Sequence, residues 1–520
     1  MVNILGYRII FLLLTNFFTC NSQGEKSVPN ILICIADDAG HMGKKYPWVN
    51  TPAFDRVADK GISFSNAYTP NAKCAPSRAC LLTARNPWQL KEAANHWNNF
   101  SQEFKTFPEA LRDFGFFTGF TGKGWGPGNP GEIDGKIREL CGGQWNKIKT
   151  ETPTNSMANI DYSANFIDFY NHKEEEQPFC FWYGGHEPHR RYEYGSSLKA
   201  GKKLSDIKKV PPFFPDNDIV RTDILDYALE IEYFDSHVTE ILNFLESNGE
   251  LDNTIVIVTS DHGMPFPRVK SDEYNESNHI PLAVMWGKNI KKSAVIINEY
   301  VSLIDIAPTI LDAVGLEWKN SGMHVSPGVS LLPLFKGDVE EFSDYVLIGK
   351  ERHDVGRPKD YGYPIRGIVK DNWLYLRNYR SDLWPAGNPE CGYTTVDGSP
   401  TKTEILKSRH NAESKYLWDL SFGKRPTEEL YNLREDPFCI NNLATEREFE
   451  TIKEALINKM VTELKKQSDP RMFGNGDIFH NYYYTWDPYR NLYDRMVNKG
   501  EEIVPIWING SDIETDLIGE

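Results

Sequence analysis

Two apolar runs in the sequence end in acidic loops that are closed by glycine. Residues 30–36 (NILICIA) lead into Asp37 and Asp38, and residues 254–258 (TIVIV) lead into Asp261 and His262. Continuous apolar runs of this length are typical of strands buried on both faces of a parallel sheet. In open sheets of this kind, binding and catalytic residues gather at the carboxyl ends of the strands. Both loops are therefore predicted to contribute to a functional site.

Cys74 lies in a second chemically unusual stretch, KCAPSRACLLTAR at residues 73–85. Asn71, Lys73 and Pro76 surround it with residues typical of loops, which argues against a core thiol. A disulfide bond is another alternative. A thiolate nucleophile would need a histidine base, and none is close in the sequence. An apolar segment that favours a helix follows directly, so Cys74 is predicted near a helix start, where anions bind well.

The elements that must position these residues alternate between strands and helices. Residues 179–183 (FCFWY) predict another buried strand, and residues 53–60, 107–114 and 222–247 carry apolar side chains at helical spacing. Residues 301–314 also predict a helix. This alternation predicts an α/β fold with a mostly parallel sheet between two layers of helices.

The pattern changes after about residue 360. Residues 365–378 alternate apolar and polar side chains, which predicts an antiparallel hairpin. Loop-rich sequence separates it from a predicted strand at residues 428–433, and residues 449–466 predict an amphipathic helix. We therefore expect a large α/β domain over residues 27–360. A smaller α+β domain, an antiparallel sheet plus a helix, is expected over residues 361–520.

The stretch around Cys74 resembles the signature of the type I sulfatases, Cys-x-Pro-Ser-Arg followed by Leu-Leu-Thr-x-Arg. This chain carries every fixed position of that signature, in Cys74, Pro76, Ser77, Arg78, Leu81, Leu82, Thr83 and Arg85. The resemblance implies an alkaline-phosphatase-like fold and a maturation enzyme that oxidises Cys74 to formylglycine. It also implies that one hydroxyl of the hydrated aldehyde attacks sulfur, and that re-forming the aldehyde expels sulfate. Ala84 departs from the glycine that many members carry.

The resemblance extends from residue 30 to about residue 450 and implies a metal site. Asp37, Asp38, Asp261 and His262 match the two metal loops of the family, and Cys74, as formylglycine, would complete the ligand set. Three carboxylates are hard oxygen donors that suit one Ca²⁺ ion. The alternative is that these acids only cap helices, but three matching positions argue against it. His262 replaces a common asparagine, and imidazole nitrogen is a poorer Ca²⁺ ligand than amide oxygen.

Four residues match catalytic positions of the family. Arg78, Lys123 and Lys270 would stabilise the charge that develops on the sulfate oxygens, and His189 would protonate the leaving group. For a single lysine the alternative is a solvated surface charge, but Lys123 stands in a Gly-Lys motif and Lys270 follows the second metal loop. Trp125 stands where many members have a histidine. The assistance of that histidine to the nucleophile is therefore absent or comes from another residue.

Three stretches resemble the N-sulfoglucosamine sulfohydrolase (heparan N-sulfatase) branch of the family in particular. They are residues 261–267, residues 300–312, and residues 351–354 together with 363–366. The third stretch follows a predicted strand and should reach the rim of the pocket. We therefore expect substrate contacts from Arg352, His353, Asp354, Arg357 and Arg366. A structural salt-bridge loop is the alternative there.

These resemblances imply a sulfatase that acts on the N-sulfoglucosamine of heparin or heparan sulfate fragments. An O-sulfatase is the first alternative, acting for example on 3-O- or 6-O-sulfated N-acetylglucosamine or on sulfated galactose. A related phosphoric-ester hydrolase would usually carry threonine or serine at the nucleophile. A non-catalytic glycan-binding lipoprotein would keep the fold, but the intact Cys74, Lys123 and His189 argue against it.

Charge and cysteine content argue against some classes of binding partner and metal. The formal net charge of -16 argues against nucleic-acid binding, which needs a basic surface. The 8 cysteines include no CxxC pair, which argues against zinc. Cys34, Cys80 and Cys180 lie in apolar runs and are expected to be core thiols. The cysteines in loop-like sequence could pair in an oxidising compartment, namely Cys141, Cys391 and Cys439.

Residues 1–20 are typical of a secretory signal. Arg8 precedes an apolar run over residues 9–18, which is too short to span a bilayer comfortably. The sequence around Cys20 resembles a loose bacterial lipoprotein signal in which Cys20 is lipidated, and ordinary cleavage nearby is the alternative. We expect a secreted, periplasmic or outer-membrane lipoprotein of a bacterium, with any membrane anchoring by lipid alone.

Overall fold

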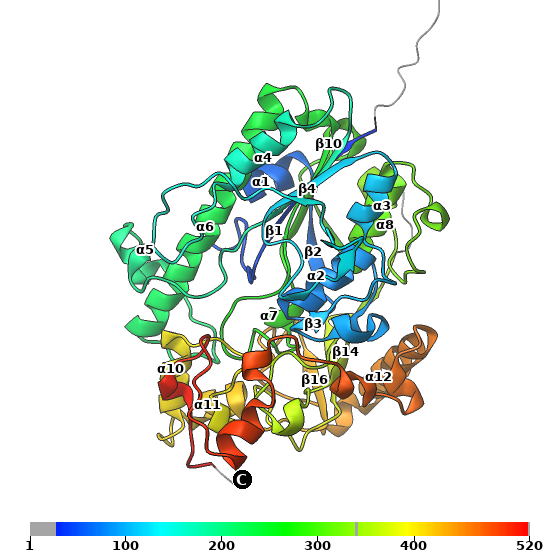
Figure 1. Cartoon of the computed structure of the whole chain (residues 1–520). Helices are drawn as coiled ribbons and strands as arrows, with labels where there is room; N and C mark the ends of the chain where they lie inside the picture. The colour runs from blue at the N-terminus through cyan, green and yellow to red at the C-terminus, as the bar shows by residue number, and fades with distance from the viewer. Residues whose placement is uncertain (1–27, 338–341, 518–520) are drawn as a thin grey trace, which may run out of the picture.

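The main sheet runs through the centre of the larger part of the molecule (Figure 1). The computed structural model describes residues 28–337 and 342–517, so the predicted signal and Cys20 lie outside the described residues. Within those ranges an eight-stranded sheet has the order β12-β2-β11-β10-β1-β9-β4-β8. In that order the strands are Val295–Ser302, Ile62–Tyr68, Leu282–Met285, Thr254–Ser260, Asn30–Ala36, Phe179–Gly184, Phe117–Gly122 and Gly143–Gln144.

Strand β1 lies at the centre of this sheet and pairs in parallel with β10 and β9. Strands β4, β8 and β12 also pair in parallel with their neighbours, whereas β11 is antiparallel to both β10 and β2. Side chains of β1 alternate between the two faces: Leu32 and Cys34 pack into one core, and Ile31 and Ile33 into the other. A sheet buried on both faces explains the continuous apolar runs, and the prediction of a mostly parallel sheet is confirmed.

Helices cover both faces of the main sheet (Figure 1). One layer contains α1 (Pro52–Lys60), α4 (Tyr162–Asn171) and the long α6 (Asp218–Ser247), whose start is capped by Asn217. The other contains α2 (Cys74–Thr83), α3 (Phe107–Asp113) and α8 (Ile306–Ala313). The short elements are β3 Asn98–Asn99, β5 Gly128–Asn129, β6 Glu132–Ile133, β7 Lys136–Ile137, α5 Ser196–Lys199, α7 Asn275–Asn278, α9 Leu332–Lys336 and α13 Ile478–Asn481.

A second, smaller sheet lies beside the main one. Its antiparallel strands are β13 (Tyr345–Lys350), β14 (Ile365–Lys370), β15 (Trp373–Asn378) and β16 (Glu428–Asn432). Asp371 and Asn372 join β14 to β15 with φ angles of 53° and 62°, the backbone that a tight two-residue hairpin requires. Helix α12 (Glu450–Lys466) packs Leu456 and Met460 against this sheet. The predicted antiparallel sheet with a helix is confirmed.

Two features of this region differ from the sequence analysis. Strand β13 belongs to the small sheet, although it lies before the expected boundary at residue 361. Its apolar side chains resemble those of a main-sheet strand, so the sequence pattern did not separate it from the larger domain. The expected loop-rich stretch before β16 contains helices α10 (Pro400–Ser408) and α11 (Lys415–Phe422). Ser399 caps α10 and Pro400 occupies its first turn, which is a helix-start signal that the sequence analysis did not use.

The cysteines of the described residues are all buried and unpaired. Cys141, Cys391 and Cys439, for which pairing was left open, are therefore free thiols, like Cys34, Cys80 and Cys180. Among the helices in residues 28–337 and 342–517, none is both long and apolar enough to cross a membrane.

Candidate active site

The carboxyl ends of β1 and β10 meet at one edge of the main sheet. The two strands pair with Ala36 opposite Ser260, so the loops that follow them start side by side. The Asp38 backbone N–H donates to Asp261 Oδ1 at 3.0 Å. Asp37, Asp38 and Asp261 are all buried at this edge. The structure thus brings together the three carboxylates that the sequence singled out.

Helix α2 begins at Cys74 and lies over this edge of the sheet. Ser77 Oγ donates to the Asp261 carbonyl at 2.6 Å, which ties the first turn of the helix to the β10 loop. Cys74 Sγ lies 3.5 Å from His262 Nε2 and 3.8 Å from Asp38 Oδ1. Burial, together with the negative charge of nearby Asp37, raises the pKa of the Cys74 thiol. An unmodified Cys74 is therefore poorly prepared to act as a thiolate nucleophile.

Four side chains form a compact group that could hold a cation. Ligand atoms of Asp37, Asp38, Cys74 and His262 all lie within 4.8 Å of one another. Asp37 Oδ1 is buried and has no hydrogen-bond partner among the described residues, which leaves it available to a metal ion. Asp261 lies outside this group, because its two oxygens accept hydrogen bonds from Arg78 and from the Asp38 backbone. Two carboxylates, an imidazole and an oxygen at position 74 fit a divalent cation.

Two lysines hold the carboxylates of this group ionised. Lys123 Nζ lies 2.6 Å from Asp37 Oδ2, and Lys270 Nζ lies 2.7 Å from Asp38 Oδ2. Burial acts to raise the pKa of both carboxyls, but the charges of Lys123 on Asp37 and of Lys270 on Asp38 outweigh it, and both pKa values lie well below the usual range. Both acids are therefore anionic at neutral pH and able to bind a cation.

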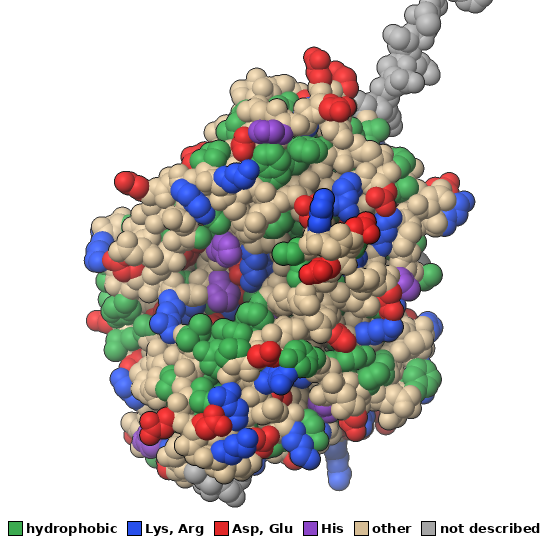
Figure 2. Space-filling model, viewed as in Figure 1, with side chains coloured by type: hydrophobic (Ala, Val, Ile, Leu, Met, Phe, Trp, Pro, Cys, Tyr) green, Lys and Arg blue, Asp and Glu red, His purple; other side chains and the backbone are tan. Residues whose placement is uncertain are grey.

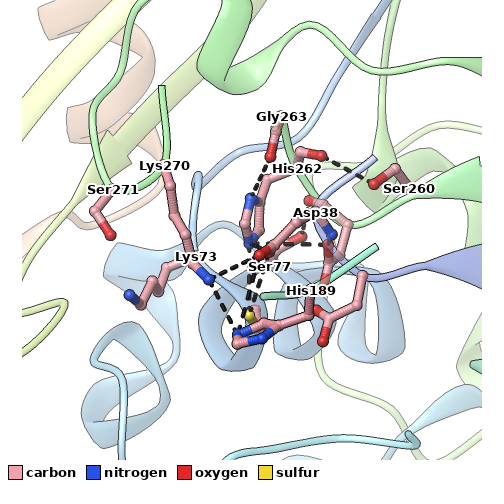
Figure 3. Close-up of polar contacts among 12 residues, drawn as sticks. Asp38, Lys73, Ser77, His189, Ser260, His262, Gly263, Lys270 and Ser271 are labelled. Carbon is pink, nitrogen blue, oxygen red and sulfur yellow. Dashed lines mark hydrogen bonds and ion pairs between the residues drawn. The ribbon is translucent and has the colours of Figure 1, made fainter. Parts of the chain in front are cut away.

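The predicted cations converge on the same place. Lys123 follows β4, Lys270 follows β10, and Arg78 reaches the site from α2. Arg78 Nε donates to Asp261 Oδ2 at 2.8 Å, and its Nη1 donates to the Lys123 carbonyl at 2.8 Å, which holds the Lys123 loop in place. Figure 3 shows Lys270 reaching toward Asp38 from the loop that carries Ser271. Positive groups fixed around one point can stabilise charge on a reacting anion.

His189 lies at the open side of this cluster, with its side chain 34% exposed. Its Nδ1 donates to the Arg190 carbonyl at 2.6 Å, and its Nε2 accepts from Lys270 Nζ at 3.1 Å. Proton donation from Nε2 therefore requires the imidazolium form. His186, from the same loop after β9, lines the site as well, and its side chain is exposed.

A cavity of about 630 Å³ opens from Cys74 to the surface. Figure 2 shows this face with a hollow in which histidine and basic side chains are visible, and hydrophobic side chains gather along one side of it. Asp37, Cys74, Lys123, His189 and Lys270, which the sequence analysis assigned to one site, all line the cavity.

The sequence analysis missed several lining residues. Asp397 Oδ2 lies 2.7 Å from Lys270 Nζ, so a residue of the C-terminal region completes the site. Lys73, directly before Cys74, lines the cavity together with His96 and Glu230. The sequence carries no clear signal for Asp397, because its partner is far away in the chain. The position of Lys73 next to the nucleophile was the one available hint.

The predicted substrate contacts divide into one that lines the cavity and four that do not. Asp354 lines it, and pairs with Lys73 at 2.9 Å. His353 is buried and its Nε2 lies 2.9 Å from Asn71 Oδ1. None of the three arginines lines the cavity.

Those three arginines have protein partners instead. Arg352 donates to the carbonyls of Tyr482 and Tyr483. Arg357 donates to the carbonyls of Trp384 and Pro385. Arg366 forms buried ion pairs with Asp469 and Glu351. Because protein acceptors hold these guanidinium groups away from the cavity, the placement favours the structural alternative for all three arginines.

Trp125, which replaces a common histidine of the family, supports α2. Its Nε1 donates to the Ala75 carbonyl at 3.0 Å, and its ring packs against Phe100. Among the described residues, the imidazole in contact with Cys74 Sγ is that of His262. The position of Trp125 therefore has a packing role in this chain.

A family model described as Sulfatase matches residues 29–316, more than half of the chain. The chain belongs to the sulfatase family. An ulvan-active sulfatase of Formosa agariphila is 28% identical over 87% of this chain and 84% of its own length. Human N-sulphoglucosamine sulphohydrolase is 27% identical over 85% of this chain and 91% of its own length.

Solved structures share the fold. One from Bacteroides thetaiotaomicron, described in connection with the metabolism of multiple glycosaminoglycans, has a TM-score of 0.63 and 18% identity over 87% of this chain and 99% of its own. The sulfatase fold is alkaline-phosphatase-like, with a mostly parallel sheet and a separate small antiparallel sheet. Sulfatases are hydrolases that generally depend on formylglycine and a metal ion. In this sulfatase Cys74 belongs to the same buried group as Asp37, Asp38 and His262.

Proposed function

We propose that this sulfatase hydrolyses the N-sulfate of glucosamine at the end of heparin or heparan sulfate fragments. The observation that carries the proposal is the similarity to human N-sulphoglucosamine sulphohydrolase along most of both chains. The resemblance of residues 261–267 and 351–354 to that branch, noted from the sequence, agrees with it. The geometry supports sulfate chemistry, because Lys123, Lys270 and His189 surround position 74 at the floor of the cavity.

Residues of the chain take distinct roles in this proposal. Formylglycine at position 74, when hydrated, supplies the hydroxyl that attacks sulfur. Lys123 binds a sulfate oxygen while remaining held by Asp37, and Lys270 exchanges its contact with His189 for a sulfate oxygen while remaining held by Asp38 and Asp397. Both stabilise the charge that grows on the sulfate. Arg78 orients the Asp261 carboxylate and the Lys123 backbone, so its role is to keep the site rigid.

His189 is the proposed proton donor. An amine is expelled from a sulfamate only when its nitrogen receives a proton, so a general acid must reach the leaving group. The imidazole of His189 is partly exposed to the cavity, and its Nδ1 is fixed by the Arg190 carbonyl. Nε2, which accepts from Lys270 Nζ at 3.1 Å, delivers the proton once the contact with Lys270 is released and His189 is in its imidazolium form.

We further propose that the cation is Ca²⁺. Asp37, Asp38 and His262, with position 74, would hold it, and Asp261 would join them by turning one oxygen away from its present donors. Bound there, the ion would polarise the sulfate and the nucleophilic oxygen. Hard carboxylate donors favour Ca²⁺ or Mg²⁺, and one imidazole does not change that preference.

An O-sulfatase acting on another sulfated glycan is the second candidate. It is favoured by the relative described as an ulvan-active sulfatase, whose identity to this chain is similar to that of the human enzyme. His189 would assist an alkoxide leaving group as readily as an amine. The two candidates therefore differ in the groups that grip the rest of the sugar.

A panel of sulfated sugars tests both candidates. Released sulfate is measured by ion chromatography with glucosamine N-sulfate, 3-O- and 6-O-sulfated N-acetylglucosamine, and sulfated galactose. We expect glucosamine N-sulfate to be hydrolysed on the order of 10⁴-fold faster, because a site built to bind a polar group strongly rejects analogues that leave it unpaired. Release from an O-sulfated sugar without release from the N-sulfated one would establish the second candidate.

Export and maturation complete the proposal. We propose that a formylglycine-generating enzyme modifies Cys74, and that the N-terminal segment directs the protein out of the bacterial cytoplasm, with Cys20 as a lipidated residue. The buried position of Cys74 supports modification before folding is complete, because the side chain is 1% exposed in the folded protein. Mass spectrometry of the mature N-terminus would detect or exclude the lipid.

A further inference from the structure

A stack of three indole rings forms the outer wall of the active-site cavity. The ring centroids of Trp97 and Trp486 lie 4.3 Å apart, and those of Trp486 and Trp507 lie 5.0 Å apart. All three residues line the cavity, together with Ile506, whose side chain is 66% exposed. Hydrophobic side chains are visible beside the hollow in Figure 2. We call Trp97, Trp486 and Trp507 the tryptophan wall.

The wall continues directly from the catalytic part of the cavity. His96, adjacent to Trp97, has its Nδ1 3.3 Å from Asp354 Oδ1, and Tyr484 donates to the same oxygen at 3.2 Å. Asp354 in turn pairs with Lys73, the residue before Cys74. A chain of contacts therefore leads from the nucleophile position outward to the rings.

The rings are fixed in place before any ligand binds. Trp507 Nε1 donates to the Thr394 carbonyl at 2.7 Å, and the Thr485 backbone N–H donates to the Trp97 carbonyl at 2.9 Å. Trp97 holds a left-handed φ of 50°, which is unusual for a bulky residue and indicates that its surroundings impose the conformation. Rigid rings lose little conformational entropy on binding, which favours affinity.

Polar groups at the wall remain available. The indole N–H groups of Trp97 and Trp486 make no hydrogen bond with any described residue. Arg191 lies at the same rim, where its Nη2 donates to the Ile506 carbonyl at 2.6 Å. Its exposed guanidinium forms no ion pair within the described ranges, so other N–H groups are free to bind an anion. The rim thus joins an aromatic surface to an unpaired positive charge.

We propose that the tryptophan wall and Arg191 bind the sugar ring next to the sulfated one, and that this neighbouring ring is an acidic sugar such as a uronic acid. This inference rests on the proposed action on sulfated sugars. The C–H face of a pyranose packs on an indole face, while its hydroxyls meet the free indole N–H groups. A carboxylate on that ring pairs with the guanidinium of Arg191, which is suited to two parallel hydrogen bonds.

Packing of the C-terminal region is the competing explanation for the rings. Tyr484 and Leu492 do form a buried cluster with Val355 and Cys391, and Trp97 and Trp486 pack against it. Packing alone would not explain why two indole N–H groups are unpaired, why Ile506 beside them is exposed, or why an arginine without an ion pair lies at the same rim. These three features together distinguish a binding surface from a packing seam.

The test compares three substrates that share one sulfated ring. They are the sulfated monosaccharide, its disaccharide with a uronic acid and its disaccharide with a neutral hexose. The ratio of kcat/KM between substrates is taken within each variant. We expect the wild type to prefer the uronate disaccharide over the monosaccharide by on the order of tenfold, the effect of one well-placed aromatic contact. Trp486→Ala should bring this ratio close to one.

Two further variants sharpen the comparison. Arg191→Ala, at an exposed site, should reduce the preference for the uronate over the neutral disaccharide and tests the proposal even where Trp486→Ala fails to fold. Tyr416→Ala removes a ring that is 54% exposed on α11, away from the cavity, and should change no ratio. A wild type without preference for the uronate disaccharide, or a Trp486→Ala variant that keeps it, would overturn the proposal.

Binding without turnover separates this inference from the proposed function. The probe is the unsulfated uronate disaccharide, and its binding to the wild type and to Trp486→Ala is followed by tryptophan fluorescence. Binding that depends on Trp486, with no sulfate released from any substrate, would refute the proposed function and uphold the wall. Sulfate release from the monosaccharide, with no binding of this probe, would support the proposed function and refute the role of the tryptophan wall.

Discussion

Lys73 and Asp354 form a buried ion pair, with 2.9 Å between Nζ and Oδ2. Lys73 directly precedes the nucleophile position at the start of α2, and Asp354 follows β13 of the small sheet, so the pair joins the two sheets of the molecule beside the active site. Burial acts to raise the pKa of Asp354, but the charges of Lys73 and His96 outweigh it and keep that pKa below its usual range.

Asp354→Asn should therefore destabilise the protein. The Lys73 ammonium would remain buried without its counter-charge, and loss of one partner of such a pair lowers the free energy of unfolding by about 3–5 kcal/mol. Because the folded-state pKa of Asp354 is depressed, its contribution is present above the ordinary aspartate pKa and is lost as the pH falls through the folded value. Urea denaturation at neutral and acidic pH measures both effects.

Asp59→Asn is the matched control for this variant. Asp59 pairs with Lys44 at 2.7 Å, but both side chains are exposed, so the change should leave the free energy of unfolding almost unaltered. Equal stability of the two variants would show that the Lys73–Asp354 pair does not hold the sheets together.

Cys74 should carry an aldehyde in protein produced with a maturation enzyme, and Cys74→Ala should abolish sulfate release. The signature around Cys74 and its contacts with Asp38 and His262 are the basis for this expectation. Mass spectrometry of the peptide that contains residue 74 detects the modification. Cys80→Ala, in the same helix and also buried, should keep both the aldehyde and the activity. Full turnover by protein with an unmodified thiol at residue 74 would contradict the prediction.

The sequence predicted the residues that follow buried strands and the residues of the sulfatase signature. Asp37 and Asp261 could be placed together because parallel neighbouring strands deliver their loops to one edge of the sheet. The local pattern around Lys123 was equally informative, since its Gly-Lys motif ends β4. In each case the information lies within a few residues of the side chain concerned.

Residues whose roles depend on distant partners could not be predicted. Arg366 was expected at the pocket, but Asp469, more than a hundred positions along the chain, turns it into a structural residue. Asp397 was not predicted, because its link to the site is the ion pair with Lys270, which is distant from it in the sequence. The packing of loops in the C-terminal region determines the partners of both Arg366 and Asp397. The periodicity of a single sequence contains no information about that packing.

Removal of divalent cations should lower both activity and thermal stability. A ligand bound only by the folded protein stabilises it, by about 2.7 kcal/mol when its concentration is 100 times its dissociation constant. Without the ion, the Asp37 Oδ1 atom stays buried without a hydrogen-bond partner in the described part of the chain, and Arg78 Nη2 lies 3.5 Å from it. Differential scanning calorimetry with chelator, and then with added Ca²⁺, measures the loss and its recovery.

The Asp38→Asn variant provides the internal comparison for the metal prediction. It removes one carboxylate of the group formed by Asp37, Asp38, Cys74 and His262. Its melting temperature should therefore respond much less to chelator and to Ca²⁺ than that of the wild type. A wild type whose melting temperature and turnover are the same in a demonstrably metal-free sample would refute the cation site.

Glu230, on α6, is a buried carboxyl that lines the active-site cavity. Its Oε1 has no hydrogen-bond partner among the described residues, and burial, with the negative charges of Glu187 and Asp226, raises its pKa to about 9. The side chain is therefore protonated at neutral pH. A neutral carboxylic acid at this place adds no negative charge to the cavity.

Glu230→Gln should stabilise the protein at neutral and mildly alkaline pH. Between the ordinary glutamate pKa and about 9, the unfolded chain has released a proton that the folded protein retains, so wild-type stability falls as the pH rises through this range. Glutamine removes that dependence, and the gain in melting temperature should grow from pH 4 to pH 8. Glu246→Gln, at an exposed site on α6 where Lys60 lowers the glutamate pKa, should show a weak trend of the opposite sign. A Glu230→Gln variant with an unchanged melting temperature at pH 8 would show that Glu230 is ionised in the folded protein.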